Sequence, residues 1–157
     1  MNRKETNRTA CALLFLLALA AHPADSQVKG GRRLRFVRGA AAASGVLRPG
    51  TREARHEYAF TAKAGQRLEA RVASGRVRLA EGVESGAVFH LTDAEGRLVP
   101  DFGDHPWGGP KEWAGALPGD GVYKIVVFVE DGPDDPDPAT LRRRKVSLPY
   151  RLSVTLR

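Results

Sequence analysis

The chain has 157 residues and a formal net charge of +7, and its apolar fraction of 42% is ordinary for a globular protein. This length fits one domain plus a processed segment. The one cysteine, Cys11, lies near the N-terminus, which excludes a disulfide framework and a cysteine-based zinc site. A basic surface suits anionic partners, although many domains without such a partner are also basic.

Residues 1–26 have the pattern of a secretory signal peptide. A basic start precedes an unbroken apolar run over residues 10–21. A run of this length is too short to cross a bilayer, which needs about twenty residues. Cleavage after Ala20 or after Ser26 satisfies the preference for small residues. We therefore expect a periplasmic or secreted protein with no membrane span in its mature form.

The mature chain begins with a polar segment that we expect to be a flexible lead, residues 27–33, and continues as one domain over residues 34–157. Alternation over residues 34–37 predicts a first strand. Residues 39–44 are Ala-rich, and the run between Gly39 and Gly45 is too short for a stable helix. We expect it to be a strand with small side chains.

Two alternating runs around a short loop predict a hairpin. Residues 55–62 place His56, Tyr58 and Phe60 on one face, and residues 66–72 return with apolar side chains at every second position. The loop between them contains a glycine, as short hairpin loops commonly do.

The middle of the chain mixes strands with turn signals. Residues 74–86 read as a loop or a weak strand, and residues 87–92 read as a further strand that is turned by residues 93–96. Prolines and paired glycines over residues 100–111 predict a loop. A short strand follows over residues 113–117.

The strongest strand signal in the sequence is the run over residues 122–129, which is rich in β-branched and aromatic side chains. Dense turn chemistry at residues 118–121 precedes it. An acidic, proline-containing segment at residues 131–138 predicts a solvated loop, and a basic cluster at residues 142–145 follows. Residues 150–156 alternate again and close the chain.

The whole pattern gives about eight short strands, separated by turn signals, and no convincing amphipathic helix. It predicts an all-β fold, a β-sandwich of the jelly-roll or Greek-key type. A closed β-barrel is the alternative.

The order of these segments resembles the bacterial pre-peptidase C-terminal domain and its stand-alone periplasmic relatives. The resemblance covers residues 34–156, and four segments carry it: residues 58–68, 89–96, 113–127 and 150–154. These segments are turn-and-strand motifs, so they specify a fold much better than a function.

The resemblance implies a small jelly-roll sandwich without catalysis. Many domains of this family are non-catalytic appendages of secreted peptidases, and some single-domain relatives are periplasmic inhibitors of goose-type lysozyme. Because the resemblance covers nearly all of the sequence after the expected signal peptide, we expect no attached enzyme and the organisation of the inhibitors. Inhibition of a basic lysozyme calls for acidic complementarity, whereas this chain is net basic. We carry no inhibitory residue over from the family.

Two residues of the glycine- and proline-rich loop are candidate binding residues. Trp107 is placed to stack on a sugar or to anchor a partner, and the alternative is that it folds back onto the core. His105 lies close to Asp101 and Asp104, so the three could converge on a metal ion. The alternative is a turn capped by the aspartates.

Charged clusters near the C-terminus give two further candidates. Arg142, Arg143 and Arg144 could contact phosphate or sulfate groups, or they could protect a sheet edge from aggregation. A weak calcium candidate is formed by four carboxylates, Asp131, Asp134, Asp135 and Asp137. Prolines interrupt this set, so a solvated loop is the alternative.

The sequence contains no pattern that predicts catalysis: neither a nucleophile motif nor a zinc-protease motif occurs. We therefore expect no enzymatic activity and no cofactor. Nucleic acid is a poor partner for an exported chain without interleaved aromatic residues. The first hypothesis is a module that binds an envelope protein, with lysozyme inhibition as its sharpest form. The second is a module that binds an anionic glycan or another polyanion such as lipopolysaccharide. An enzyme is a third hypothesis, which a surface cleft holding Asp101, Asp104 and His105 in contact would revive.

Overall fold

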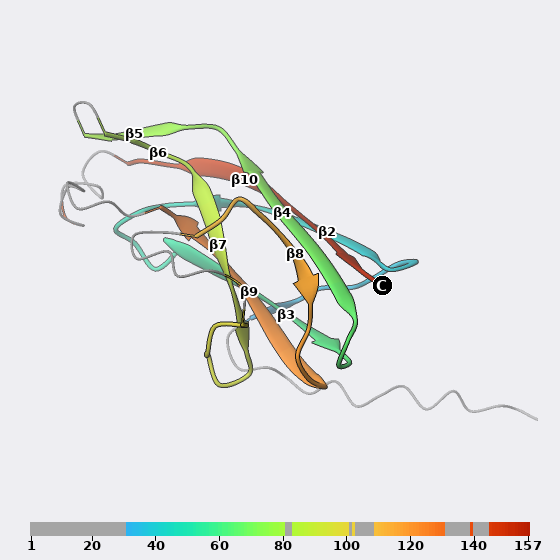
Figure 1. Cartoon of the computed structure of the whole chain (residues 1–157). Helices are drawn as coiled ribbons and strands as arrows, with labels where there is room; N and C mark the ends of the chain where they lie inside the picture. Colours follow the sequence, from blue (N-terminus) through green and yellow to red (C-terminus); the bar gives the residue numbers. More distant parts are fainter. Residues whose placement is uncertain (1–30, 81–82, 101, 103–108, 131–138, 140–144) are drawn as a thin grey trace, which may run out of the picture.

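A computed structural model describes residues 31–80, 83–100, 102, 109–130, 139 and 145–157. Within these residues the chain forms ten strands, of which eight build two facing four-stranded sheets (Figure 1). The strand order of the first sheet is β1 (Arg32–Arg33), β3 (Arg55–Ala62), β9 (Gly121–Val129) and β7 (Ala87–Asp93). The order of the second sheet is β2 (Ala40–Leu47), β10 (Leu148–Leu156), β4 (Arg67–Ser74) and β8 (Glu112–Ala116).

This arrangement confirms the predicted all-β sandwich. The C-terminal strand β10 lies between β2 and β4, antiparallel to both, and β9 lies between β3 and β7. Such a non-sequential order is typical of Greek-key and jelly-roll sandwiches. The predicted signal peptide, residues 1–26, lies outside the described residues. No helix in the described ranges is long and apolar enough to span a membrane.

The strand count differs from the predicted eight in two places. The segment read as a loop or weak strand forms a small separate hairpin, β5 (Val77–Ala80) with β6 (Val83–Ser85). The predicted first strand at residues 34–37 is wrong: the strand is β1 (Arg32–Arg33), just before it, and residues 34–37 pass from one sheet to the other. The backbone N–H of Leu34 donates to Ala59 of β3 (2.8 Å), whereas Val37 pairs with Ala40 at the start of β2.

A tight turn allows this passage between the sheets. Arg38 and Gly39 both have positive φ angles, 52° and 77°. Two consecutive left-handed residues form the turn that suits a two-residue hairpin. A Cβ at Gly39 would lie 2.8 Å from the carbonyl oxygen of Leu156, so glycine is required there for close approach as well.

The core lies between the two sheets, where alternate residues of each strand face inward. On β9 the side chains of Tyr123, Ile125 and Val127 are buried, as the alternation predicted. The inward residues of the other strands are likewise buried, among them Tyr58, Phe60, Leu68, Phe89 and Leu152. Two inner faces that interdigitate in this way form the core of a sandwich.

Candidate functional site

Turns 63–66, 93–97 and 117–121 lie together at one end of the sandwich, which we call the loop end (Figure 1). Two of them are joined directly by backbone hydrogen bonds. The N–H of Gly65 donates to the carbonyl of Leu117, and the N–H of Leu117 donates to the carbonyl of Gln66, both at 2.9 Å. The N–H of Ala64 also donates to Oδ1 of Asp120 at 2.7 Å. The hairpin loop and the β8–β9 turn therefore form one unit.

The third turn of the loop end, residues 93–97, is organised by the carboxylate of Asp93. Its Oδ1 accepts the N–H groups of Glu95 (3.0 Å) and Arg97 (2.9 Å), and its Oδ2 accepts Nε of Arg97 at 2.7 Å. Desolvation opposes ionisation of Asp93, but hydrogen bonds from the Arg97 backbone and side chain lower the pKa of this carboxyl below its ordinary value. The carboxylate is therefore charged at neutral pH.

The turns at residues 93–97 and 117–121 border a hollow of about 340 Å³, which has an acidic lining. Among the described residues that line it, Asp93, Glu95 and Asp120 supply three carboxylates, and Arg97 supplies one cation. Leu98, also in the lining, is 48% exposed, so an apolar side chain stands beside the carboxylates. The lining of this hollow is therefore net negative, although Lys63 and Lys124 lie close by and the chain as a whole is positive.

A second hollow, of about 380 Å³, lies at the other end of β3 and is lined by Arg32, Arg52, Arg55, His56 and Glu57. We call it the arginine hollow. Arg32 comes from β1, Arg52 from the loop between β2 and β3, and the remaining three residues from the start of β3. Three guanidinium groups against one carboxylate make this hollow locally positive.

His56, which lines the arginine hollow, is held in place by a chain of hydrogen bonds that runs between the two sheets. The hydroxyl of Tyr150, on β10, lies 2.7 Å from Nδ1 of His56 and 2.6 Å from the hydroxyl of Tyr58. Gly45 of β2 leaves the space for it, because a Cβ there would lie 2.7 Å from Nδ1 of His56 and 2.9 Å from the Tyr150 hydroxyl. Burial raises the pKa of Tyr150 well above its ordinary value, so this hydroxyl stays protonated.

The same surroundings hold His56 neutral. Burial, followed by the positive charge of Arg32, lowers the pKa of His56 below its ordinary value of 6.5, and the carboxylate of Glu53 opposes this shift. The unfolded chain therefore takes up a proton at His56 at a higher pH than the folded chain does. The stability that His56 contributes is present above about pH 6.5 and is lost as the pH falls through the folded-state pKa.

This linkage gives a measurable pH dependence. We expect the free energy of unfolding to fall between about pH 7.5 and about pH 5 more steeply in the parent protein than in His56→Gln, which cannot take up a proton. Urea denaturation of both proteins across this range measures the difference. Comparing the two proteins cancels the titration of the carboxylates they share. A constant difference between them at every pH would contradict the linkage.

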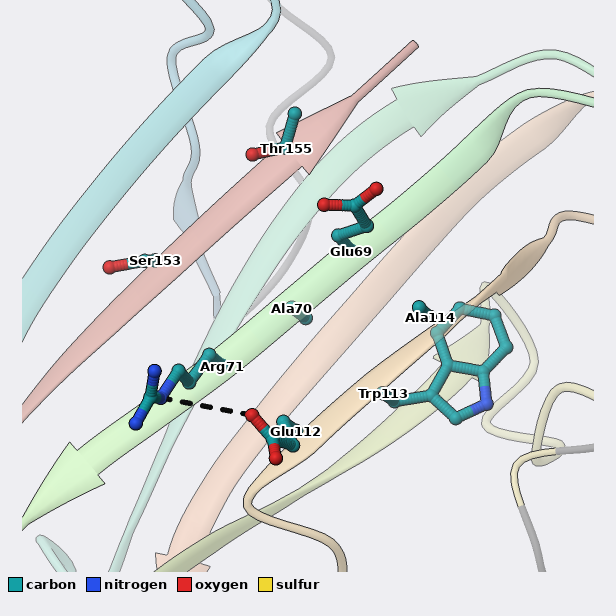
Figure 2. Close-up of a pocket in the computed structure, with 8 residues that line it drawn as sticks. All are labelled: Glu69, Ala70, Arg71, Glu112, Trp113, Ala114, Ser153 and Thr155. Atoms are coloured by element: carbon teal, nitrogen blue, oxygen red, sulfur yellow. Dashed lines mark ion pairs between the residues drawn. The ribbon is translucent and has the colours of Figure 1, made fainter.

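A third depression lies on the outer face of the second sheet (Figure 2), where short side chains such as Ser153 and Thr155 stand beside longer charged ones. Arg71 and Glu112 form an exposed ion pair there (Nε to Oε2, 3.9 Å), an arrangement that contributes little free energy. Trp113 at its edge packs against Phe102, with ring centroids 5.9 Å apart. The polar groups of this face do not converge on a common point, so we do not place the functional site here.

Every site residue predicted from the sequence lies outside the described residues: His105, Trp107, Asp131, Asp134, Asp135, Asp137, Arg142, Arg143 and Arg144. They remain predictions. Among the described residues, no three metal-binding side chains gather into a cluster. The sequence did predict the turns at residues 93–96 and 118–121. Their meeting depends on the pairing of β7 with β9, which no local motif encodes.

The fold places the chain in the class of small two-sheet β-sandwiches. No family model matches the chain, and no curated protein sequence matches it. Solved structures do match. PliG of Aeromonas hydrophila, a periplasmic inhibitor of g-type lysozyme, is 24% identical with a TM-score of 0.51, and the match covers 82% of this chain and 96% of that one.

Two further solved structures are more distant. PliG of Salmonella Typhimurium, also a periplasmic inhibitor of g-type lysozyme, is 18% identical with a TM-score of 0.48, covering 82% of this chain and 99% of that one. The pre-peptidase C-terminal domain of a Bacillus anthracis collagenase is 13% identical with a TM-score of 0.42, and the match covers 80% of this chain and 93% of that one. The match to the Aeromonas protein confirms the fold that the sequence resemblance implied.

Proposed function

We propose that this chain is an exported, non-catalytic binding protein whose partner is a g-type lysozyme. The observation that carries the proposal is the hollow of the loop end, a preformed site with an acidic lining on an otherwise basic chain. The likeness to Aeromonas PliG, over 96% of that inhibitor, supports the class of partner and the exported location.

The rigidity of the loop end suits it to tight binding. Residues 63–66 and 117–121 share backbone hydrogen bonds, and the Tyr123 hydroxyl donates to the carbonyl of Gly119 at 2.7 Å. Asp93 fixes the remaining turn, and Nζ of Lys124 donates to the carbonyl of Ala94 at 3.1 Å. Loops that are already ordered lose little conformational entropy when a partner binds.

The chemistry of the loop end also suits a basic partner. The carboxylates of Asp93, Glu95 and Asp120 supply the acidic complementarity that the net charge of the chain lacks. The exposed side chain of Leu98, in the same lining, offers apolar area, as the centre of a protein interface commonly does. Repulsion from the basic remainder of the chain would favour docking at this end.

Inhibition of lysis tests the proposal. We expect an excess of the purified protein to suppress the lytic activity of a g-type lysozyme on bacterial cells. Glu95→Arg is expected to weaken the inhibition about tenfold or more, since it reverses a charge in the acidic hollow. Glu112→Arg is the matched control: both carboxylates are exposed and paired with an arginine, but Glu112 lies on the outer face of the second sheet.

Full lytic activity in the presence of excess folded protein would overturn the proposed partner. Equal loss of inhibition in Glu95→Arg and Glu112→Arg would instead show that the loop end is not the contact surface. Circular dichroism of each variant verifies that it is folded.

A further inference from the structure

We propose that the arginine hollow binds a tetrahedral oxyanion, phosphate or sulfate, at a site separate from the loop end. The two sites lie at opposite ends of β3, since Arg55 begins this strand and Ala62 ends it. Eight residues of strand separate the sites by roughly 23 Å. The inference therefore does not depend on the proposed lysozyme partner.

The first support is the convergence of positive charge from separate segments. Arg32 of β1, Arg52 of the β2–β3 loop and Arg55 of β3 all line one hollow of about 380 Å³. Guanidinium groups are suited to oxyanions because their planar N–H donors match pairs of oxygen atoms. The volume leaves room for the oxyanion and for part of a molecule that carries it.

The second support is that this charge is only partly neutralised. Glu57 accepts from Nη2 of Arg55 at 2.7 Å, and nearby Glu53 is occupied by Arg48. In the part of the chain that the structure describes, no carboxylate lies within ion-pair distance of Arg32 or Arg52. Two guanidinium groups beside one hollow repel each other, and a bound anion would relieve that repulsion.

The third support is the proton arrangement of the hydrogen-bond chain beneath the hollow. Both tyrosine hydroxyls find acceptors only if Tyr58 donates to Tyr150 and Tyr150 donates to Nδ1 of His56. The reverse order would leave the buried Tyr58 hydroxyl hydrogen without an acceptor among the described residues. Neutral His56 then carries its proton on Nε2, where it adds a hydrogen-bond donor to the hollow that this ring lines.

A titration followed by NMR tests the site. Sodium phosphate is added to the ¹⁵N-labelled chain at constant ionic strength, with sodium chloride as the reference titration. We expect saturable shifts at the side chains of Arg32 and Arg52 and at Nε2 of His56. Arg52→Gln, a change of one exposed loop residue, is expected to weaken phosphate binding about tenfold, and Arg32→Gln with Arg52→Gln is expected to weaken it further.

The double variant Arg71→Gln with Arg151→Gln is the control for net charge. It also removes two positive charges, but from the outer face of the second sheet. It should leave the affinity unchanged. The proposal is overturned if the shifts do not saturate, if chloride reproduces them, or if the control pair weakens binding as much as the hollow variants do.

A parallel titration with glucose 6-phosphate distinguishes the sources of the anion. Tighter binding than that of inorganic phosphate would assign the site to a phosphate ester on a sugar, and equal binding would assign it to the free ion. Either result supports the oxyanion site. Lysozyme inhibition that survives Arg52→Gln would separate this site from the proposed function.

Discussion

Replacing Leu152 by alanine is expected to lower the free energy of unfolding by about 2–5 kcal/mol. Leu152 is fully buried at the middle of β10, between Ala43 of β2 and Val72 of β4, so the substitution leaves a cavity that the two sheets cannot close without shifting. Urea denaturation followed by circular dichroism measures the change.

Ser153→Ala is the matched control for this prediction. Ser153 is the next residue of the same strand, and its side chain points to the exposed outer face. Its replacement should change the free energy of unfolding by no more than about 0.5 kcal/mol. If both variants lost a similar amount of unfolding free energy, then the side chains of β10 would not alternate between the core and the solvent.

The second large effect is expected at Gly45. A methyl group there would lie 2.7 Å from Nδ1 of His56 and 2.9 Å from the Tyr150 hydroxyl, so either the hydrogen-bond chain breaks or the sheets move apart. We expect Gly45→Ala to cost about 1–3 kcal/mol of unfolding free energy, measured by the same denaturation. Gly75→Ala is the control, because a Cβ at Gly75 meets no atom within 4 Å.

A double-mutant cycle shows whether the hydroxyl is the cause. Tyr150→Phe removes the oxygen that the new methyl group would approach, so the effects of Gly45→Ala and Tyr150→Phe should not add. Two results would contradict this account: additive effects of the two substitutions, or a Gly45→Ala variant as stable as Gly75→Ala. Either would mean that the close approach of Gly45 to the Tyr150 hydroxyl is not needed for the packing of the two sheets.

Local alternation in the sequence was sufficient to find the longest strands. β9 and the hairpin of β3 and β4 were predicted because each has apolar side chains at every second position between clear turn residues. The Ala-rich β2 was predicted because its run is too short for a helix. Where periodicity is short, prediction failed: residues 34–37 alternate, yet they only carry the chain from one sheet to the other.

The arrangement of the candidate sites was not predictable in the same way. Arg32, Arg52 and Arg55 meet because β1 pairs with β3, a contact of two residues that leaves no pattern in the sequence. The acidic character of the loop end was hidden by the net charge, since carboxylates from two turns combine only in the folded sheet. Long-range pairing, rather than local propensity, creates both surfaces.

Amide hydrogen exchange, measured with and without a g-type lysozyme, most directly tests whether the loop end is the contact surface. We expect exchange to slow at residues 93–97 and 117–121 when the lysozyme is added, and to stay unchanged in the β2–β3 loop beside the arginine hollow. Unchanged exchange at the loop end, or protection confined to the arginine hollow, would contradict the proposed mode of binding.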